Sequence, residues 1–398
     1  MPIRTLGPAA LIVLAASLPV HAQDAARFAE RFEAVYGSMG SPLDLGAATT
    51  QDDGAILFEN ATATVEDMPP LTFSIRFDGV EETADGGFTA EGFEIAGFTA
   101  DLGTLAPMQS LELSLEGITG ENIVLPAEGE TVDDTLRLAR VIEAGTLSLR
   151  VGGAEIFSIE SMRGAVTSGL DADPVDTIGF EYVVGPMRLD LVALDSEEAK
   201  SAAKRIGRLA LEATFTMAGS WQLEDGLLSF EEVSIDAPGF GRLDMPFAIL
   251  GFDRPLVADI YTAQGASLEA SQRNDRAAHT RIQTGIGVKM LELRLVSAGL
   301  NFIDAGFVAA MTRIEAANND IDVHKARDRM IEQARALIAG FNLGEFGDTL
   351  AERIASFLAE PDSLSIAIEP REPVRLISIG GAAIHLPGLV NLLSPTLR

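Results

Sequence analysis

Three histidines beyond the first 22 residues are the side chains best suited to acid–base chemistry: His279, His324 and His385. No two of them have the H-x-H or H-E-x-x-H spacing by which neighbouring histidines bind zinc. Serine catalysis would need one of them beside an activated serine, and no G-x-S-x-G motif occurs. A triad from distant parts of the chain stays open, because triads assemble through space. The histidines therefore predict no particular catalytic site.

Two groups of acidic residues have spacings similar to those of calcium-binding loops. The first group is Asn318, Asp320 and Asp322, at loop positions 1, 3 and 5. Val323 stands where the turn needs glycine, and Arg329 stands where a bidentate carboxylate belongs. We therefore expect Asp320 and Asp322 to separate two helices and to cap the second one. The second group, Asp171, Asp173 and Asp176, also fails, because Asp176 is out of register and Tyr182 stands at position 12.

No cofactor or metal is expected from this composition. The chain has no cysteine, which excludes thiolate zinc sites, iron–sulfur clusters and cysteine nucleophiles. A carboxylate pair for glycoside hydrolysis stays open, because only the separation of the two groups in space is diagnostic. One tryptophan and three tyrosines offer few rings on which sugars could stack.

One predicted helix concentrates positive charge. Its cations are Lys200, Lys204, Arg205 and Arg208. Three of them follow each other at intervals of four residues, so they share a helix face that could bind an anionic headgroup or an acidic partner. The alternative is structural, because cations near a helix C-terminus complement its dipole and pair with Glu197 and Glu198.

The overall charge is strongly negative. The 398 residues carry a formal net charge of −30 at pH 7. Such a field repels nucleic acid and anionic bilayers at long range, so we expect no nucleic-acid partner. The same charge also keeps an exported protein soluble.

The first 22 residues have the pattern of a secretory signal peptide. Arg4 precedes an apolar run from Leu6 to Val20, and small residues follow up to Ala22. We expect cleavage before Gln23, a periplasmic location, and no transmembrane segment in the mature chain.

Residues 54–265 have the two-residue period of β-strands. Leucine, isoleucine and phenylalanine alternate with charged or hydroxyl residues, for example in 71–78, 111–116 and 211–217. Such strands bury one face and leave the other in water. The pattern predicts an α+β fold dominated by twisted antiparallel sheet.

Helices are expected on both sides of this region and within it. An amphipathic helix over 24–36 and a linker over 37–42 make up an N-terminal segment, 23–53. Within the β-rich domain, helices are predicted near 131–144 and 195–209. Each is followed directly by a strand, which suggests a duplicated strand–helix unit.

The C-terminal segment, 266–398, is predicted to be helical and to end in a strand pair packed on the β-rich domain. Helical periodicity covers 301–318 and 322–341, and Asp348 is expected to cap a third helix. Residues 364–368 and 374–379 have strand-like patterns.

The stretch from Phe357 to Ile366, followed by Pro370, Pro373 and Val374, resembles the C-terminal portion of uncharacterised exported proteins from proteobacteria. The resemblance covers less than a tenth of the chain, and its motif is structural. It implies no activity.

Taken together, these features predict a non-enzymatic envelope protein. Its one-faced strands could bind a lipid or another hydrophobic small molecule, or another envelope protein. One alternative is a structural or assembly scaffold with a sealed core. Another is a hydrolase whose active-site residues are dispersed along the sequence.

Overall fold

The computed structural model describes most of the chain beyond the predicted signal peptide. The described residues are 22–38, 43–63, 71–106, 109–127, 136, 138–170, 175–193, 196–383 and 386–397.

All the described strands belong to one sheet, and every pairing is antiparallel. In chain order the strands are β1 (Leu43–Asp44), β2 (Ala48–Thr50), β3 (Ile56–Ala63), β4 (Leu71–Asp78), β5 (Glu81–Glu82), β6 (Phe88–Ala106), β7 (Gln109–Leu125), β8 (Ala139–Ala144), β9 (Leu147–Val151), β10 (Ala154–Ile159), β11 (Met162–Ser168), β12 (Thr177–Asp190), β13 (Ala210–Gln222), β14 (Leu227–Ala237), β15 (Gly241–Asp244), β16 (Phe247–Leu250), β17 (Arg294–Asp304), β18 (Ser363–Ile368), β19 (Val374–Arg375) and β20 (Pro395–Leu397).

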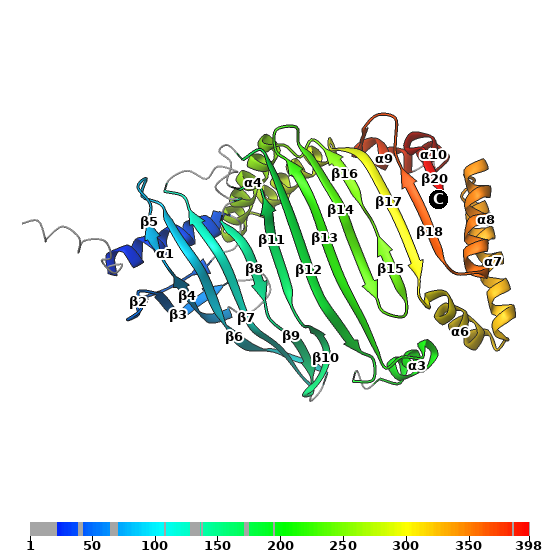
Figure 1. The fold of residues 1–398 in the computed structure, drawn as a ribbon, viewed down its shortest axis with the longest axis horizontal. Coiled ribbons are helices and arrows are strands. Elements are labelled where there is room, and N and C mark those ends of the chain that lie inside the picture. Colours follow the sequence, from blue (N-terminus) through cyan, green and yellow to red (C-terminus); the bar gives the residue numbers. More distant parts are fainter. Residues whose placement is uncertain are drawn as a thin grey trace, which may run out of the picture.

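The sheet is a long meander in which chain neighbours pair (Figure 1). From β3 the order runs through β4, β6 and β7. Next come β8 and β9, both beside β7, and then β11 and β10, both beside β12. The order continues through β13 and β14 to β15 and β16, both beside β17, and β18 follows.

The register lines up apolar side chains from strand to strand. One row of cross-strand neighbours is Ile75, Ile95, Ile118, Ala144, Met162, Val184, Phe215, Ile235, Leu243, Phe302 and Leu364. Every member is apolar, from β4 to β18. Because successive residues of a strand point to opposite sides, these positions define one face, which we call the apolar face.

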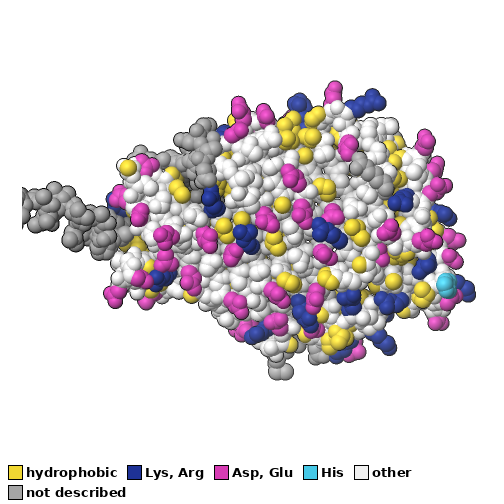
Figure 2. Space-filling model, in the orientation of Figure 1, with side chains coloured by type: hydrophobic (Ala, Val, Ile, Leu, Met, Phe, Trp, Pro, Cys, Tyr) yellow, Lys and Arg dark blue, Asp and Glu magenta, His cyan; other side chains and the backbone are white. Residues whose placement is uncertain are grey.

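The next row along the strands points to the opposite side, the polar face. Its members are Arg76, Glu94, Thr119, Glu143, Arg163, Val183, Thr216, Ser234, Asp244, Asn301 and Ser365. All but Val183 are polar. Figure 2 shows acidic and basic side chains spread over the sheet on the side nearest the viewer.

A bulge between Val184 and Met187 in β12 keeps the apolar face continuous. Val184 pairs with Phe215 and Met187 pairs with Ala213, and these two partners are two residues apart on a regular part of β13. The extra residue in β12 therefore returns Met187 to the apolar face. A second apolar row crosses the strands there: Phe98, Leu115, Leu147, Ile159, Met187 and Ala213.

The described helices lie around the sheet rather than within it (Figure 1). They are α1 (Ala22–Ser38), α3 (Glu197–Ile206), α4 (Arg254–Gln272), α5 (Arg276–Met290), α6 (Phe307–Asn319), α7 (Val323–Gly340), α8 (Glu345–Ala359), α9 (Leu376–Ala383) and α10 (Leu386–Leu393). No described helix combines the length and the apolar composition needed to cross a membrane.

Helices cover the apolar face at several places. Near the N-terminus, Phe28 and Phe32 of α1 pack on Phe77 of β4. Val257 of α4 joins a second core around Trp221 of β13. Toward the other edge, Phe357 of α8 contacts the ring of Phe302 on β17.

The structure confirms the predicted α+β class with a dominant antiparallel sheet. It also confirms the helix near 195–209 in shorter form, the helix over 322–341, and the strand over 364–368. The helix predicted from 24 begins at Ala22 and extends to Ser38, two residues into the predicted linker. The predicted signal peptide lies almost entirely outside the described residues.

Four predicted elements differ from the structure in type or in bounds. Residues 139–144 form strand β8 instead of the end of a helix, because they pair with β7 and β11. Residues 301–304 belong to β17, and only the part after Gly306 is helical. Gly344, not Asp348, precedes α8. Of 374–379, only the first two residues pair as a strand, and the rest begins α9.

The predicted boundary near 265 falls inside α4. Strands β17 and β18 lie beyond this boundary, and they extend the same sheet. The helical segment is thus interleaved with sheet.

Candidate ligand-binding site

A cavity of about 520 Å³ lies on the apolar face where α3 and α6 cover the sheet. Its sheet wall consists of Phe157, Met187, Leu189, Leu211 and Ala213. These residues alternate along β12 and β13 and meet across the strands, so they share the apolar face.

Helices and a turn form the rest of the cavity. Ile206 comes from the last turn of α3, and Phe240 comes from the turn between β14 and β15. The α6 wall consists of Phe307, Ala310, Met311 and Ile314. Phe307 and Met311 remain 43% and 38% exposed, so the cavity is open to solvent at α6.

The middle of the apolar face also stays partly open. Ile142 of β8, Ile235 of β14 and Leu300 of β17 are 42%, 37% and 38% exposed. Their strand positions place all three on the apolar face. These three side chains lie on different strands, and their exposure shows that helices leave parts of the apolar face uncovered.

The predicted basic residues gather at the end of α3. Ser196 begins the helix by accepting a hydrogen bond from the Ala199 N–H at 3.0 Å. Gly207 ends it in the left-handed conformation, with φ of 79°, which glycine adopts without strain. In Figure 2, Lys and Arg side chains concentrate at the lower right, where Figure 1 places α3.

The helix ends earlier than predicted, and this changes the position of Arg208. Because Gly207 ends α3, Arg208 lies outside the helix and does not continue the face of Lys200 and Lys204. Its guanidinium carbon instead lies 5.0 Å from the ring centroid of Phe240. Leu209, the next residue, is 70% exposed.

The other cations of α3 have varied partners. Lys200 pairs with Glu197 at 3.4 Å. Arg205 donates to the Asn318 side chain at 2.9 Å. Lys204 is exposed on the last turn. The prediction that these residues bind a ligand stays a prediction.

Arg313 is a cation of this cluster that the sequence analysis missed. It lies on α6 and donates to the Ile206 carbonyl at 3.1 Å, at the C-terminal end of α3. Arg313 is more than 100 residues from α3 in sequence, and only the packing of α3 against α6 brings it here. We call Lys204, Arg205, Arg208 and Arg313 the cationic rim.

Arginines on the polar face have acidic partners, as the alternation of the strands predicts. Hydrogen bonds from Arg76 hold the pKa of Asp53 below its usual value, and Asp78 and Asp53 together raise the pKa of Arg76. Asp244 raises the pKa of Arg242 in the same way.

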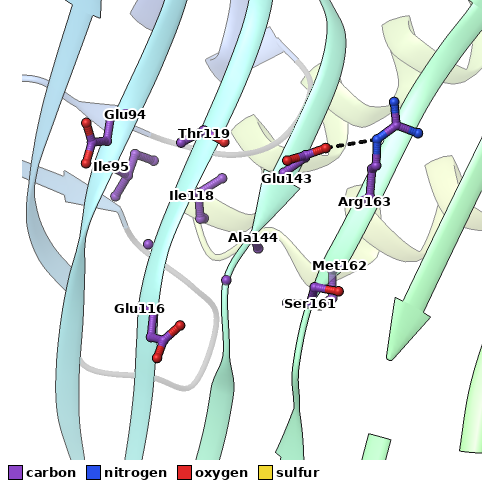
Figure 3. A pocket seen from close by; sticks show the side chains of 12 residues that line it. Glu94, Ile95, Glu116, Ile118, Thr119, Glu143, Ala144, Ser161, Met162 and Arg163 are labelled. Carbon is purple, nitrogen blue, oxygen red and sulfur yellow. Dashed lines mark hydrogen bonds and ion pairs between the residues drawn. The ribbon is translucent and has the colours of Figure 1, made fainter. Parts of the chain in front are cut away.

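An open hollow of about 450 Å³ lies over β6, β7, β8 and β11. Figure 3 shows Glu94, Glu116 and Glu143 at this hollow, with Arg163 beside them. Arg163 Nε donates to Glu143 at 2.9 Å, and its guanidinium is 3.6 Å from Glu181. These contacts make the hollow part of the ion-paired polar face, with no nucleophile and base in contact.

The structure brings one histidine next to a serine. The Ser267 hydroxyl on α4 lies 2.9 Å from His279 Nδ1 on α5, and Gln283 donates to the same hydroxyl at 3.0 Å. Ser267 is buried between the helices, and none of the cavities above includes it. No described carboxylate bonds to His279, so this pair joins two helices rather than forming a triad. His324 is exposed on α7, and His385 lies outside the described residues.

The first acidic group marks helix boundaries, whereas Asp176 of the second group lies directly before strand β12. Asp320 ends α6 with φ of 52°, and the Asp322 carboxylate accepts the N–H groups of His324 and Lys325 at 3.0 Å. These bonds lower the pKa of Asp322. Asp171 and Asp173 lie outside the described residues. Within the described part of the chain, no cluster of three His, Asp or Glu residues could hold a metal ion.

Comparison with known proteins gives one result. A family model described as "Uncharacterized protein" matches residues 234–397, less than half of the chain. The match includes the stretch from Phe357 to Val374 that resembles an uncharacterised family, and it includes α6 of the cavity but not α3. A search of curated proteins finds no match. The chain is thus similar to an uncharacterised family over its C-terminal region.

Proposed function

We propose that this protein works in the cell envelope and binds a lipid-like hydrophobic ligand on the apolar face of its sheet. The observation that carries the proposal is the unbroken apolar row from Ile75 to Leu364, together with the exposure of more than a third of Ile235 in this row and of Leu300 beside it on the same face.

The free energy gained by removing apolar surface from water supports a ligand on this face. Each Å² of apolar surface removed from water stabilises a protein or complex by about 25 cal/mol. An acyl chain lying along the half-buried middle of this row would bury both its own surface and that of the strands. The cavity under α3 and α6 is within the range of about 300–1,000 Å³ typical of small-ligand sites.

The two alternative functions have less support. A sealed scaffold would bury its apolar face against a second sheet, whereas the described strands form one sheet. A hydrolase would need a reactive pair in a cavity, and the Ser267–His279 contact lies elsewhere.

The proposal is tested by lipid content after purification of the exported form. N-terminal sequencing of that form should begin at Gln23. Native mass spectrometry and solvent extraction should then detect bound lipid, and the delipidated protein should take up a fluorescent acyl probe. Leu300→Glu should weaken probe binding at least about tenfold, because it places a charge under the acyl chain.

The matched control is Ile303→Glu, on the same strand but on the polar face, where Ile303 is 43% exposed. It should bind the probe as the wild type does. Equal loss in both variants, or a wild-type protein without lipid and without probe uptake, would contradict the proposal.

A further inference from the structure

We propose that the ligand is an anionic phospholipid whose phosphate binds the cationic rim while an acyl chain enters the cavity beneath α3 and α6. This inference rests on the proposed function and adds the chemical class of the ligand and the position of its headgroup.

Among the described residues, the positive charge of the rim is not compensated by acidic partners. Lys204, Arg205, Arg208 and Arg313 form no ion pair with a carboxylate in the part of the chain that the structure describes. On the polar face, by contrast, Arg76, Arg163, Arg188 and Arg242 are all paired with acidic residues. These four cations lie near the end of α3, in a protein of net charge −30.

Two carboxylates near the rim are paired with other cations. Glu212 borders the cavity, but it accepts a hydrogen bond from Arg188 at 2.9 Å. Glu197 pairs with Lys200. These carboxylates are thus already neutralised by other cations, and the rim keeps its positive field for an outside anion.

The cationic rim adjoins the cavity through two of its arginines. Arg208 lies over the ring of Phe240, and Phe240 lines the cavity. Arg313 bonds to the carbonyl of Ile206, which also lines the cavity. Charged and apolar parts therefore meet at two adjacent points. A ligand that satisfies both must be an amphiphile with its anionic group next to the start of its apolar chain.

The chemistry of the arginines indicates which anionic group of the ligand binds the rim. Guanidinium groups bind phosphate through paired N–H···O bonds, and a lipid phosphodiester has two ester oxygens as weaker acceptors besides its two charged oxygens, whereas a carboxylate has two oxygens in all. The rim thus favours a phosphate headgroup over the carboxylate of a free fatty acid.

The helix-dipole explanation covers only part of the cluster. Lys204 and Arg205 lie in the last turn of α3, and Arg313 bonds to a terminal carbonyl, so all three stabilise the helix end. Arg208 lies beyond that end and contacts an aromatic ring. A purely structural rim would not distinguish one lipid headgroup from another.

The experiment uses the full-length protein after removal of lipid. The fluorescent ligands are added without vesicles, and each carries the same labelled acyl chain. The ligands are phosphatidylglycerol, phosphatidylcholine and palmitate. We expect the wild type to prefer phosphatidylglycerol over phosphatidylcholine. Arg208→Gln should lower the affinity for phosphatidylglycerol about tenfold and that for phosphatidylcholine by less, because it removes one charge-assisted contact to the phosphate and the choline cation already offsets the charge of that phosphate. The preference should also decrease with salt.

Two further variants separate headgroup from chain. Met311→Trp fills the cavity mouth and should weaken both phospholipids equally. Arg281→Gln makes the same charge change on the exposed surface of α5 and should change neither. Circular dichroism melting of each variant checks that the fold is retained.

Each outcome decides between the two proposals. Binding of both phospholipids with equal affinity, unaffected by Arg208→Gln, would overturn the headgroup site and leave the proposed function standing. Palmitate bound more tightly than phosphatidylglycerol would overturn the phosphate assignment. Binding of none of the three would contradict the proposed function itself.

Discussion

Tyr261 places a phenol on α4 against the apolar cluster around Trp221. Burial raises the pKa of the Tyr261 hydroxyl above its ordinary value of 10.0. The folded state therefore favours the neutral phenol, whereas an unfolded chain ionises it freely. The stability that results is present below pH 10 and is lost as the pH rises through the folded-state pKa.

Tyr261→Phe should make the protein less sensitive to alkali. We expect the wild type to lose more unfolding free energy than the variant between about pH 9 and about pH 11, because only the wild type has this phenol to ionise. Urea denaturation of both proteins across this range measures the difference. Parallel stability curves would show that Tyr261 ionises equally in the folded and unfolded states.

Arg208 shows how far a single residue can be predicted. Its type and its place near a helix end were evident from the sequence, and they suggested an anion site. Its actual environment depends on Gly207 ending α3 and on the turn at Phe240. Neither the early end of α3 nor the contact of Arg208 with Phe240, 32 residues away in the sequence, can be recognised from the periodicity of apolar residues. Arg313 had no such signal at all, because only helix packing brings it to α3.

At the scale of elements, α1 closes the N-terminal end of the apolar face. Phe28 is 0% exposed, and its ring contacts Phe77 at 4.8 Å and Phe88 at 5.6 Å in edge-on geometry. Such pairs add about 0.5–1.5 kcal/mol beyond area burial. The core there depends on this helix, because α1 supplies the residues that face β4 and β6.

Phe28→Ala should be among the most destabilising substitutions in the chain. We expect a loss of about 3–5 kcal/mol, the cost of a large cavity in a packed core. Chemical denaturation measures it. Leu337→Ala on α7 is the control, because Leu337 is 63% exposed and its loss should cost no more than about 0.5 kcal/mol. Similar losses in both variants would mean that α1 is not integral to the core.

Strands with a regular alternation were predictable, and several helices were not. Residues 71–78 and 211–217 form strands because alternation fits a sheet with one wet face. Residues 139–144 have good helix formers, yet they pair with β7 and β11, since tertiary pairing overrides weak local propensity. Helices α4 and α5 escaped notice because their apolar residues are not confined to one face.

At the scale of the whole molecule, the arrangement of charge combines ion pairs on the polar face with an excess of acidic residues. The polar face carries ion pairs in rows, such as Arg163 with Glu143 and Arg188 with Glu212. The remaining acidic side chains repel one another, because acidic residues outnumber basic ones, 59 to 29.

Moderate salt should therefore stabilise the protein. We expect Tm to rise by at least about 2 °C from low to physiological ionic strength, because screening reduces the repulsion more than it weakens exposed pairs. Differential scanning calorimetry in sodium chloride measures the shift. A fall in Tm would mean that the ion pairs of the polar face outweigh the net charge.

By itself, the sequence determined the class of the molecule. The alternation between residues 54 and 265 requires strands with one apolar and one polar side, because a strand turns successive side chains to opposite faces. Composition and spacing also excluded thiol chemistry and calcium loops. Tertiary structure alone decided that the strands form one sheet rather than two packed ones, and that helices cover the apolar face only in part. Alternation is the same in either case, because it records which side avoids water and not what covers that side.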